Sequence, residues 1–323
     1  MQTPTESLTV YYPEAVELTT KQLHVFWLPD EVNVEKDLQD MLVNMSEAEK
    51  HGVITTLKLF TLYEAIAGDE YWGGRFKKEF PRPDLLRMAS TFSMFELAVH
   101  LPFYNKINEL LHLNTDEFYT EYTKDTTLTA RMAFIDDIVN HKDPLISLGA
   151  FSMVEGAVLY SSFAFLKHFQ SQGKNKLMNI VRGINFSVRD ENLHCLGGAW
   201  AFRQLKDELN LTEDQLVIVE STLRQAARAL YEHEARIADM IFEKGSIAGI
   251  TATQLKHFVQ SRLNECLTNL GFEKEFEVKY NPIADWFYDG INGFAFNDFF
   301  SGVGNSYQRN WSETEFVWET NNG

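Results

Sequence analysis

The chain has little cysteine and no recognisable N-terminal targeting signal. Cys195 and Cys266 are its two cysteines, too few for a disulfide framework, and they fit a reducing, intracellular compartment. The polar segment 1–9 lacks the basic and apolar regions of a signal peptide. No run of about 18 or more uncharged apolar residues occurs, so a membrane span is not expected. These features predict a cytoplasmic protein with no membrane partner.

Basic residues are also few. The 29 Lys and Arg residues are outnumbered by 46 Asp and Glu residues, which gives a formal net charge of -17. Such a chain repels phosphate, so a nucleic-acid partner is not expected. Strand-like alternation is scarce as well. The 323 residues are instead 45% hydrophobic and 13% aromatic, enough apolar material for one large core or two ordinary ones.

Helix start and stop signals dominate the sequence. Three capping boxes precede apolar periodic segments that end at a glycine: Ser46–Glu49 with a stop at Gly68, Thr212–Gln215 with Gly245, and Thr251–Gln254 with Gly271. The apolar stretch from Pro144 to Gly173 is long enough for a buried helix, and another helix is expected from Asn175 to Leu205. Residues 37–270 are therefore predicted to form roughly eight helices with short links.

This pattern predicts an all-α fold, a ferritin-like helical bundle with additional helices. No linker divides the chain, so residues 1–303 are expected to form one helical domain with an N-terminal extension. Residues 304–323 lack periodicity and contain Asn, Ser, Thr and Glu with isolated aromatics. We expect them to be a flexible tail.

The strongest local motif is Glu191-x-x-His194. Because the two residues are three apart, they point from one face of a helix. Two Glu-x-x-His pairs plus one Glu from each of two other helices form the dimetal site of ferritin-like bundles. Oxygen ligands with one His per metal favour iron or manganese. Alone the motif is weak, because most such pairs are solvated.

Two glutamates in apolar helices strengthen the interpretation. Glu155 lies in a segment of Val, Ala, Leu and Phe, and Glu64 lies in Leu-Phe-Thr-Leu-Tyr-Glu-Ala-Ile. An unpaired carboxylate there would be costly to bury, and metal coordination would offset that cost. The alternative is that each glutamate lies on a narrow polar stripe.

Two pairs compete for the remaining half-site. Glu109 and His112 have the three-residue spacing, whereas Glu96 and His100 are four apart. We favour Glu96 and His100, because Pro102 would clash with the preceding turn and a π-bulge would both relieve the clash and absorb an extra residue. Glu64 to Glu96 spans 32 positions, close to the 36 between Glu155 and Glu191.

With these residues, the sequence resembles a known family, the small subunit of class I ribonucleotide reductase. The resemblance extends from about residue 21 to residue 311. It rests on four segments in order: Gln22 to Val32 with Trp27-Leu-Pro-Asp-Glu; Leu57 to Gly68 around Glu64; the pair Glu155 to Phe165 and Arg189 to His194; and Asn281-Pro-Ile-Ala-Asp-Trp.

The resemblance implies a role for each matching residue. Glu64, Glu96 and His100 would bind one side of a dimetal centre, and Glu155, Glu191 and His194 the other side. Tyr104 matches the tyrosine that is oxidised to a stable radical, and Phe163 would help to shield it. Trp27 and Asp190 would link the centre through His100 to the surface, and Tyr307 in the tail would pass the radical on. For Tyr104 the plain alternative is an ordinary buried tyrosine; for Trp27, a packing anchor; for Tyr307, a generic partner-binding aromatic.

The same resemblance implies an oxidoreductase subunit that binds two metal ions, di-iron first and manganese or a mixed pair as alternatives. The subunit would react with O2 and act with a large subunit, bound through the tail, in reducing ribonucleotides. It also implies a homodimer. Departures from the family pattern are Glu64, where many members have Asp, and the extra residue between Glu96 and His100. A stand-alone dimetal oxidase or oxygenase and a ferritin-like storage protein remain the alternatives.

Overall fold

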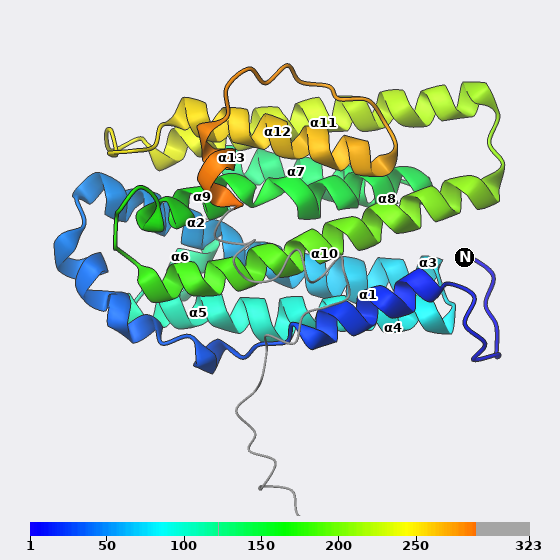
Figure 1. Ribbon diagram of the computed structural model, residues 1–323, viewed down its shortest axis with the longest axis horizontal. Helices are drawn as coiled ribbons and strands as arrows, with labels where there is room; N and C mark the ends of the chain where they lie inside the picture. The colour runs from blue at the N-terminus through cyan, green and yellow to red at the C-terminus, as the bar shows by residue number, and fades with distance from the viewer. Residues whose placement is uncertain (122, 289–323) are drawn as a thin grey trace, which may run out of the picture.

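The computed structural model describes residues 1–121 and 123–288 as a bundle of long helices lying side by side (Figure 1). Within these residues no strand occurs, and only an isolated bridge joins Ile247 to Ile250. The α-helices are α1 (Pro13–His24), α2 (Glu47–Ala65), α3 (Lys77–Glu79), α4 (Pro83–Phe95), α5 (Leu101–Leu110), α6 (Asp116–Glu121), α7 (Thr126–Val139), α8 (Pro144–Met153), α9 (Tyr160–Lys167), α10 (Met178–Leu209), α11 (Glu213–Ile241), α12 (Ala252–Leu270) and α13 (Pro282–Phe287). The predicted all-α, ferritin-like bundle is confirmed.

Several of these helices are joined without a break by π-helical turns. The π-helical segments are Asp40–Asn44, Ile66–Phe76 between α2 and α3, Glu96–His100 between α4 and α5, and Val154–Val158 between α8 and α9. Short 3₁₀ turns lie at Pro29–Glu31, Val34–Asp37 and His168–Gln170. Four long helical units therefore form the centre of the bundle: α2 to α3, α4 to α5, α8 to α9, and α10.

The capping predictions are confirmed. The side chains of Thr212 and Thr251 each accept a hydrogen bond from the backbone N–H three residues ahead. The side chains of Gln215 and Gln254 accept one from the backbone N–H of Thr212 and Thr251 in turn. Gly271 ends α12 with a positive φ of 92°, a conformation that glycine adopts at little cost.

Three predicted boundaries shift. The stop at Gly68 is wrong, because the helix continues through the π-helical segment to Glu79. Helix α11 ends at Ile241, before Gly245, and α10 begins at Met178.

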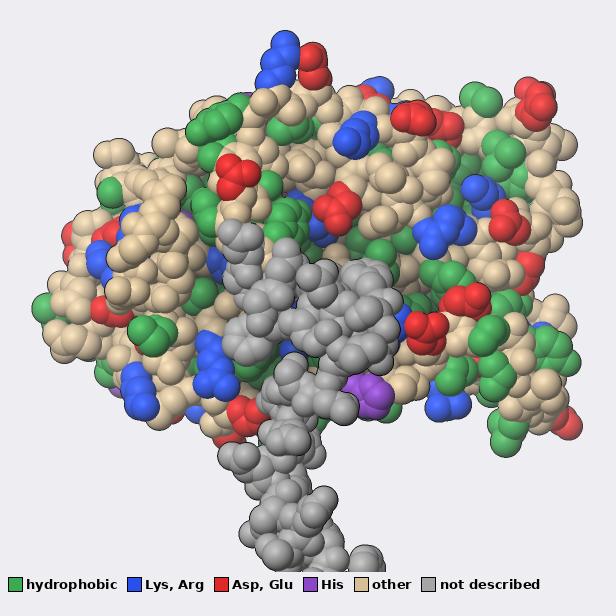
Figure 2. All heavy atoms as spheres, in the orientation of Figure 1, with side chains coloured by type: hydrophobic (Ala, Val, Ile, Leu, Met, Phe, Trp, Pro, Cys, Tyr) green, Lys and Arg blue, Asp and Glu red, His purple; other side chains and the backbone are tan. Residues whose placement is uncertain are grey.

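The core is one cluster of buried apolar residues that extends from Met1 to Phe287. The run Pro144–Gln170 is long and apolar enough to cross a membrane by composition, but its most apolar window is entirely buried in the bundle. Its hydrophobicity is therefore explained by packing between α10, α11 and α12. On the face shown in Figure 2, acidic and basic side chains are interspersed.

Candidate metal centre

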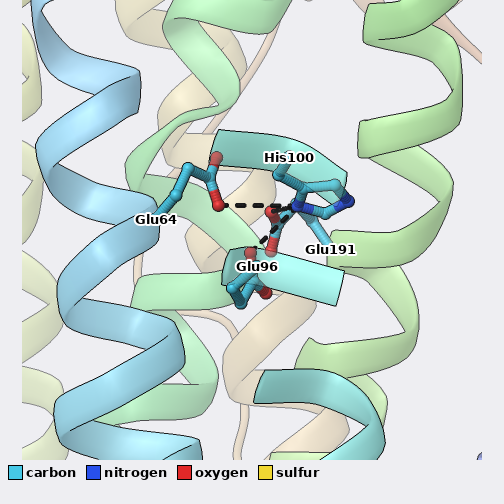
Figure 3. Close-up of side chains that lie close together, drawn as sticks. All are labelled: Glu64, Glu96, His100 and Glu191. Carbon is cyan, nitrogen blue, oxygen red and sulfur yellow. Dashed lines mark hydrogen bonds and ion pairs between the residues drawn. The ribbon is translucent and has the colours of Figure 1, made fainter. Parts of the chain in front are cut away.

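Side chains from three helical units meet in the first half of a buried cluster. Figure 3 shows Glu64 from α2 facing Glu96 and His100 from the π-helical turn, with Glu191 from α10 beside them. The Nδ1 atom of His100 lies 2.9 Å from Glu96 Oε2, 3.2 Å from Glu191 Oε1 and 3.5 Å from Glu64 Oε2. One ligand atom from each residue lies within 4.8 Å of the others, so a single cation could contact all four.

The second half of the cluster contains Glu155 and His194 with the same two shared glutamates. His194 Nδ1 lies 2.5 Å from Glu96 Oε1, 3.5 Å from Glu191 Oε2 and 3.8 Å from Glu155 Oε2. These four residues again place ligand atoms within 4.8 Å of one another. Since Glu96 and Glu191 belong to both groups, the cluster could hold two adjacent cations that share these carboxylates.

The rival pair does not join this cluster. Glu109 and His112 are both exposed, and Glu109 accepts a hydrogen bond from Asn105 on its own helix. His112 follows the end of α5 with a positive φ of 56°. The structure therefore brings together the six residues favoured from the sequence and leaves this pair at the surface.

A π-helical turn explains how Glu96 and His100 share a face despite their four-residue spacing. The segment Glu96–His100 is π-helical, as predicted, and Pro102 follows it at the start of α5. A π-helical turn contains one residue more than an α-helical turn, so the two side chains converge on the same point. Glu155 lies inside another π-helical segment, Val154–Val158, which the sequence did not predict.

The carboxylates strongly perturb one another. Burial raises the pKa of Glu64 well above its usual value, and the nearby carboxylate of Glu96 raises it further. Burial and then Glu191 have the same effect on the pKa of Glu155. Such a concentration of negative charge in a dry interior is unfavourable unless cations neutralise it.

The pKa values of the two histidines reflect the same excess of negative charge around them. Burial lowers the pKa of His100 and of His194, but the carboxylates around them, Glu96 foremost, raise both well above the usual value. Both oxygens of Glu64 and both of Glu191 are buried and accept no hydrogen bond of regular geometry. Lone pairs left free in this way, with one imidazole per half-site, fit a pair of hard or borderline divalent cations such as iron or manganese.

A hydrogen-bonded chain leads away from the first half-site. His100 Nε2 lies 3.1 Å from Asp190 Oδ2, and the indole Nε1 of Trp27 donates to the same oxygen at 2.7 Å. Gln22 donates to the other oxygen of Asp190 at 3.0 Å. All four side chains are fully buried, so this contact fixes the orientation of the imidazole.

Tyr104 is sealed beside the cluster. It is 0% exposed, and its ring stacks on Phe60 with centroids 4.4 Å apart. The ring of Phe163 also stacks on Phe60, with centroids 5.2 Å apart. Burial raises the pKa of Tyr104 well above its usual value, and the carboxylate of Glu64 raises it further. The hydroxyl therefore keeps its proton unless the ring is oxidised.

Sequence reasoning missed three residues of this site. Trp72 donates from Nε1 to Glu155 Oε1 at 3.0 Å, and the ring of Phe92 packs on His194 with centroids 4.4 Å apart. Tyr63, next to Glu64, is buried with its hydroxyl unpaired, and burial and the carboxylate of Glu155 raise its pKa. No motif marks these aromatics, because they differ from other core aromatics only in what they contact.

An apolar cavity of about 360 Å³ adjoins the second half-site. Tyr63, Ala67 and Val154 form part of its wall, and these residues lie close in sequence to Glu64 and Glu155. Ala133 and Asp136 of α7 also line it, and both are exposed. The cavity therefore extends from the surface toward the cluster.

Tyr307 and the predicted tail, residues 304–323, lie outside the described residues. The structure thus bears on the metal ligands, Tyr104, Trp27 and Asp190, but not on the last step of the expected radical path.

Comparisons with known proteins agree with this geometry. Residues 6–282 match the family model described as ribonucleotide reductase, small chain. The chain is 24% identical over 327 residues to a probable ribonucleoside-diphosphate reductase small subunit of invertebrate iridescent virus 3, covering 95% of this chain and 85% of that protein. It is 26% identical to the ribonucleoside-diphosphate reductase subunit beta of Bacillus subtilis, covering 88% and 85%.

Two solved structures share the fold. The dimanganese(II)-NrdF of Streptococcus sanguinis superposes with a TM-score of 0.77 at 22% identity, covering 90% of this chain and 100% of that one. A putative class I ribonucleotide reductase of Bacillus halodurans gives a TM-score of 0.75 at 23% identity, covering 87% and 100%. With a family match over most of its length and a buried carboxylate–histidine cluster at its centre, the chain belongs to the ribonucleotide reductase small-chain family, a family of oxidoreductase subunits.

Proposed function

We propose that this chain is a radical-generating subunit that holds two iron or manganese ions and stores an oxidising equivalent on Tyr104. The observation that supports this most is the overlap of the two Glu/His groups, which share Glu96 and Glu191. One of the structural relatives is described as a dimanganese(II) protein, which fits the same kind of donor set.

In this proposal Glu64, Glu96 and His100 hold one ion, and Glu155, Glu191 and His194 hold the other. The bound pair would supply electrons for the reduction of dioxygen. The protein supplies a dry site and fixed ligands: Trp72 orients Glu155, and Asp190 orients His100. Di-iron, di-manganese and a mixed pair are all compatible with these donors.

In this proposal Tyr104 would be the residue that is oxidised, by loss of one electron from its ring and of its hydroxyl proton. Its aromatic pocket has two properties that a long-lived radical needs: the ring is fully buried, and it is covered by Phe60. The contact of Trp27 with Asp190 and of Asp190 with His100 would then provide the proton-coupled electron path between the centre and the surface.

The subunit would deliver its oxidising equivalent to a large subunit that reduces ribonucleotides to deoxyribonucleotides. In this proposal, residues 1–303 are the dimetal domain and residues 304–323 are a flexible tail that docks on the large subunit, with Tyr307 as the transfer residue. The protein would act as a cytoplasmic homodimer. Truncation at residue 303 should abolish binding of the large subunit while leaving metal binding intact, as measured by calorimetry and metal analysis.

The radical assignment is tested by reconstituting the metal-free protein anaerobically with Fe(II) and then exposing it to air. We expect about two ions per chain and an organic-radical EPR signal that is lost in Tyr104→Phe. Tyr160→Phe is the matched control, because Tyr160 is also buried with an unpaired hydroxyl but is not part of the cluster. A signal that survives in Tyr104→Phe, or that disappears in Tyr63→Phe instead, would show that the assignment is wrong.

The cavity beside Tyr63 favours one second candidate, a stand-alone dimetal oxidase that binds a small apolar substrate there. Turnover of such a substrate without any partner protein would favour this candidate. Ferritin-like storage is distinguished by metal analysis, since it requires many ions per chain.

A further inference from the structure

The chain's two thiols lie in contact behind the second half-site. Cys195 on α10 and Cys266 on α12 are 71 positions apart in sequence, yet their Sγ atoms are 3.9 Å apart. Both side chains are 0% exposed. Neither thiol has a part in the proposed radical chemistry, so their pairing needs a separate account.

This thiol pair is coupled to two metal ligands through the backbone. Cys195 directly follows His194, and both sulfur atoms pack against Gly156, which directly follows Glu155. A Cβ atom added at Gly156 would lie 2.4 Å from Cys266 Sγ and 2.5 Å from Cys195 Sγ, so only glycine fits between the π-helical segment and the sulfurs. A change at either sulfur is therefore transmitted to the backbone next to Glu155 and His194.

Hydrogen bonds from neighbouring side chains hold the backbones of Gly156 and Cys195 in place. Arg262 donates from Nε to the carbonyl of Gly156 at 3.0 Å, and the Ser152 hydroxyl donates to the carbonyl of Cys195 at 2.9 Å. The backbones of Gly156 and Cys195 are thus each held by a hydrogen bond from a buried side chain. Packed interiors of this kind transmit small displacements instead of absorbing them.

We propose that Cys195 and Cys266 form a reversible disulfide when the protein meets a peroxide-class oxidant, and that this bond weakens metal binding at Glu155 and His194. One thiol attacks a peroxide oxygen, which gives a sulfenic acid and releases one water molecule. The second thiol attacks the oxidised sulfur, forming the S–S bond and releasing a second water molecule. The sulfur pair loses two electrons to the O–O bond, and both thiol protons end in water.

The effect on the metal centre follows from the distance that the sulfurs must travel. A disulfide bond is about 2.05 Å long, so the thiols must approach each other by nearly half of their 3.9 Å separation. Because both sulfurs already pack against Gly156, we expect their approach to displace the π-helical turn that carries Glu155. Loss of a hydrogen-bond partner that orients a metal ligand weakens metal affinity by about 10- to 100-fold, and we expect displacement of the backbone at Glu155 and His194 to act on the same scale.

The first test uses full-length, metal-free protein and so does not depend on the proposed function. The protein is treated with hydrogen peroxide and then unfolded in urea that contains N-ethylmaleimide, and its mass is measured. We expect a loss of two hydrogen atoms, no maleimide adducts, a peptide that links positions 195 and 266, and reversal by dithiothreitol. Two free thiols after treatment, or a sulfinic acid on one cysteine, would overturn the proposal.

The coupling is tested by titrating Mn(II) into the oxidised and the reduced protein. We expect at least about 10-fold weaker binding after oxidation and no effect of peroxide in Cys266→Ser or in Cys266→Ala. A disulfide that forms without changing Mn(II) affinity would overturn the coupling to Glu155 and His194. If the reduced protein also binds no metal, the proposed metal centre fails, and the coupling fails with it, whereas the disulfide is judged by the mass measurement alone.

Discussion

A buried ion pair beside the second half-site allows a quantitative test of how the bundle is held together. Arg131 on α7 donates from Nε to Glu234 on α11 at 2.6 Å, and both side chains are nearly inaccessible. Ser161 on α9 donates to the other oxygen of Glu234 at 3.2 Å. Arg131 also reaches the carbonyl of Val158, the last residue of the π-helical turn that contains Glu155.

Removing one partner leaves the other charge buried without compensation. We expect Arg131→Met or Glu234→Leu to lower the free energy of unfolding by about 3–5 kcal/mol. The double variant replaces both charges with apolar groups of similar volume, so it should lie within about 1–2 kcal/mol of the wild type. Lys256→Met is the matched control: its ion pair with Asp239 also joins two helices but is solvent-accessible, and its loss should cost less than about 1 kcal/mol.

The pH dependence sharpens this test. Burial raises the pKa of Glu234 even with Arg131 beside it, and without the guanidinium the pKa rises further. The folded Arg131→Met variant therefore binds more protons than its unfolded state, so its stability falls as pH rises above the ordinary glutamate pKa of 4.5. Urea unfolding of the metal-free proteins, followed by circular dichroism, measures the free energy of unfolding of the wild type, the two single variants, the double variant and the control. Additive losses in the double variant would refute the argument that the uncompensated charge is the source of the cost.

Three further predictions concern other parts of the structure. In Gly183→Ala the new Cβ would lie 2.2 Å from the ring of Phe103, so we expect a loss of about 1–3 kcal/mol in urea unfolding. Burial lowers the pKa of His168 to about 3, so the unfolded state binds more protons below pH 6.5 and the folded protein should lose about 2 kcal/mol between pH 6.5 and pH 5. His168→Asn, which retains an N–H donor, should show a flatter pH profile in thermal unfolding. Ala133→Phe at the cavity mouth should abolish xenon binding, detected by ¹²⁹Xe NMR of the metal-free protein, whereas Ala130→Phe, exposed on the same helix but not in the cavity wall, should leave it unchanged.

Local signals in the sequence were sufficient for most of the helices. The capping boxes at Thr212 and Thr251 act within four residues, so the same contacts form whatever the rest of the chain does. The apolar run after Pro144 was long enough to indicate a buried helix without any knowledge of its neighbours. Buried carboxylates in apolar helices were informative for a similar reason, because an unpaired charge there is too costly to be accidental.

The π-helical turn at Val154–Val158 could not be predicted from local sequence signals. At Glu96 the sequence contained two clues, a four-residue spacing to His100 and a nearby Pro102, and together these predicted the π-helical turn. Val154–Val158 has neither clue: Glu155 has no histidine partner on its own helix, and no proline follows. That turn is stabilised by contacts from distant helices, including Arg131 at Val158 and Arg262 at Gly156. Its conformation is therefore a property of the assembled bundle.

Gly68 shows how a local rule can point to the right residue for the wrong reason. The glycine was expected to end the helix, yet the chain continues in helical form to Glu79. A Cβ at Gly68 would lie 2.7 Å from the Cβ of Glu96, so the glycine allows the helices that carry Glu64 and Glu96 to approach closely. Because Gly68 has no side chain, Glu96 can pack closely against the π-helical segment that follows α2, which brings Glu96 near Glu64. A glycine within a few residues of a buried carboxylate is thus as consistent with close helix packing as with a helix end, and only the position of the second helix decides between them.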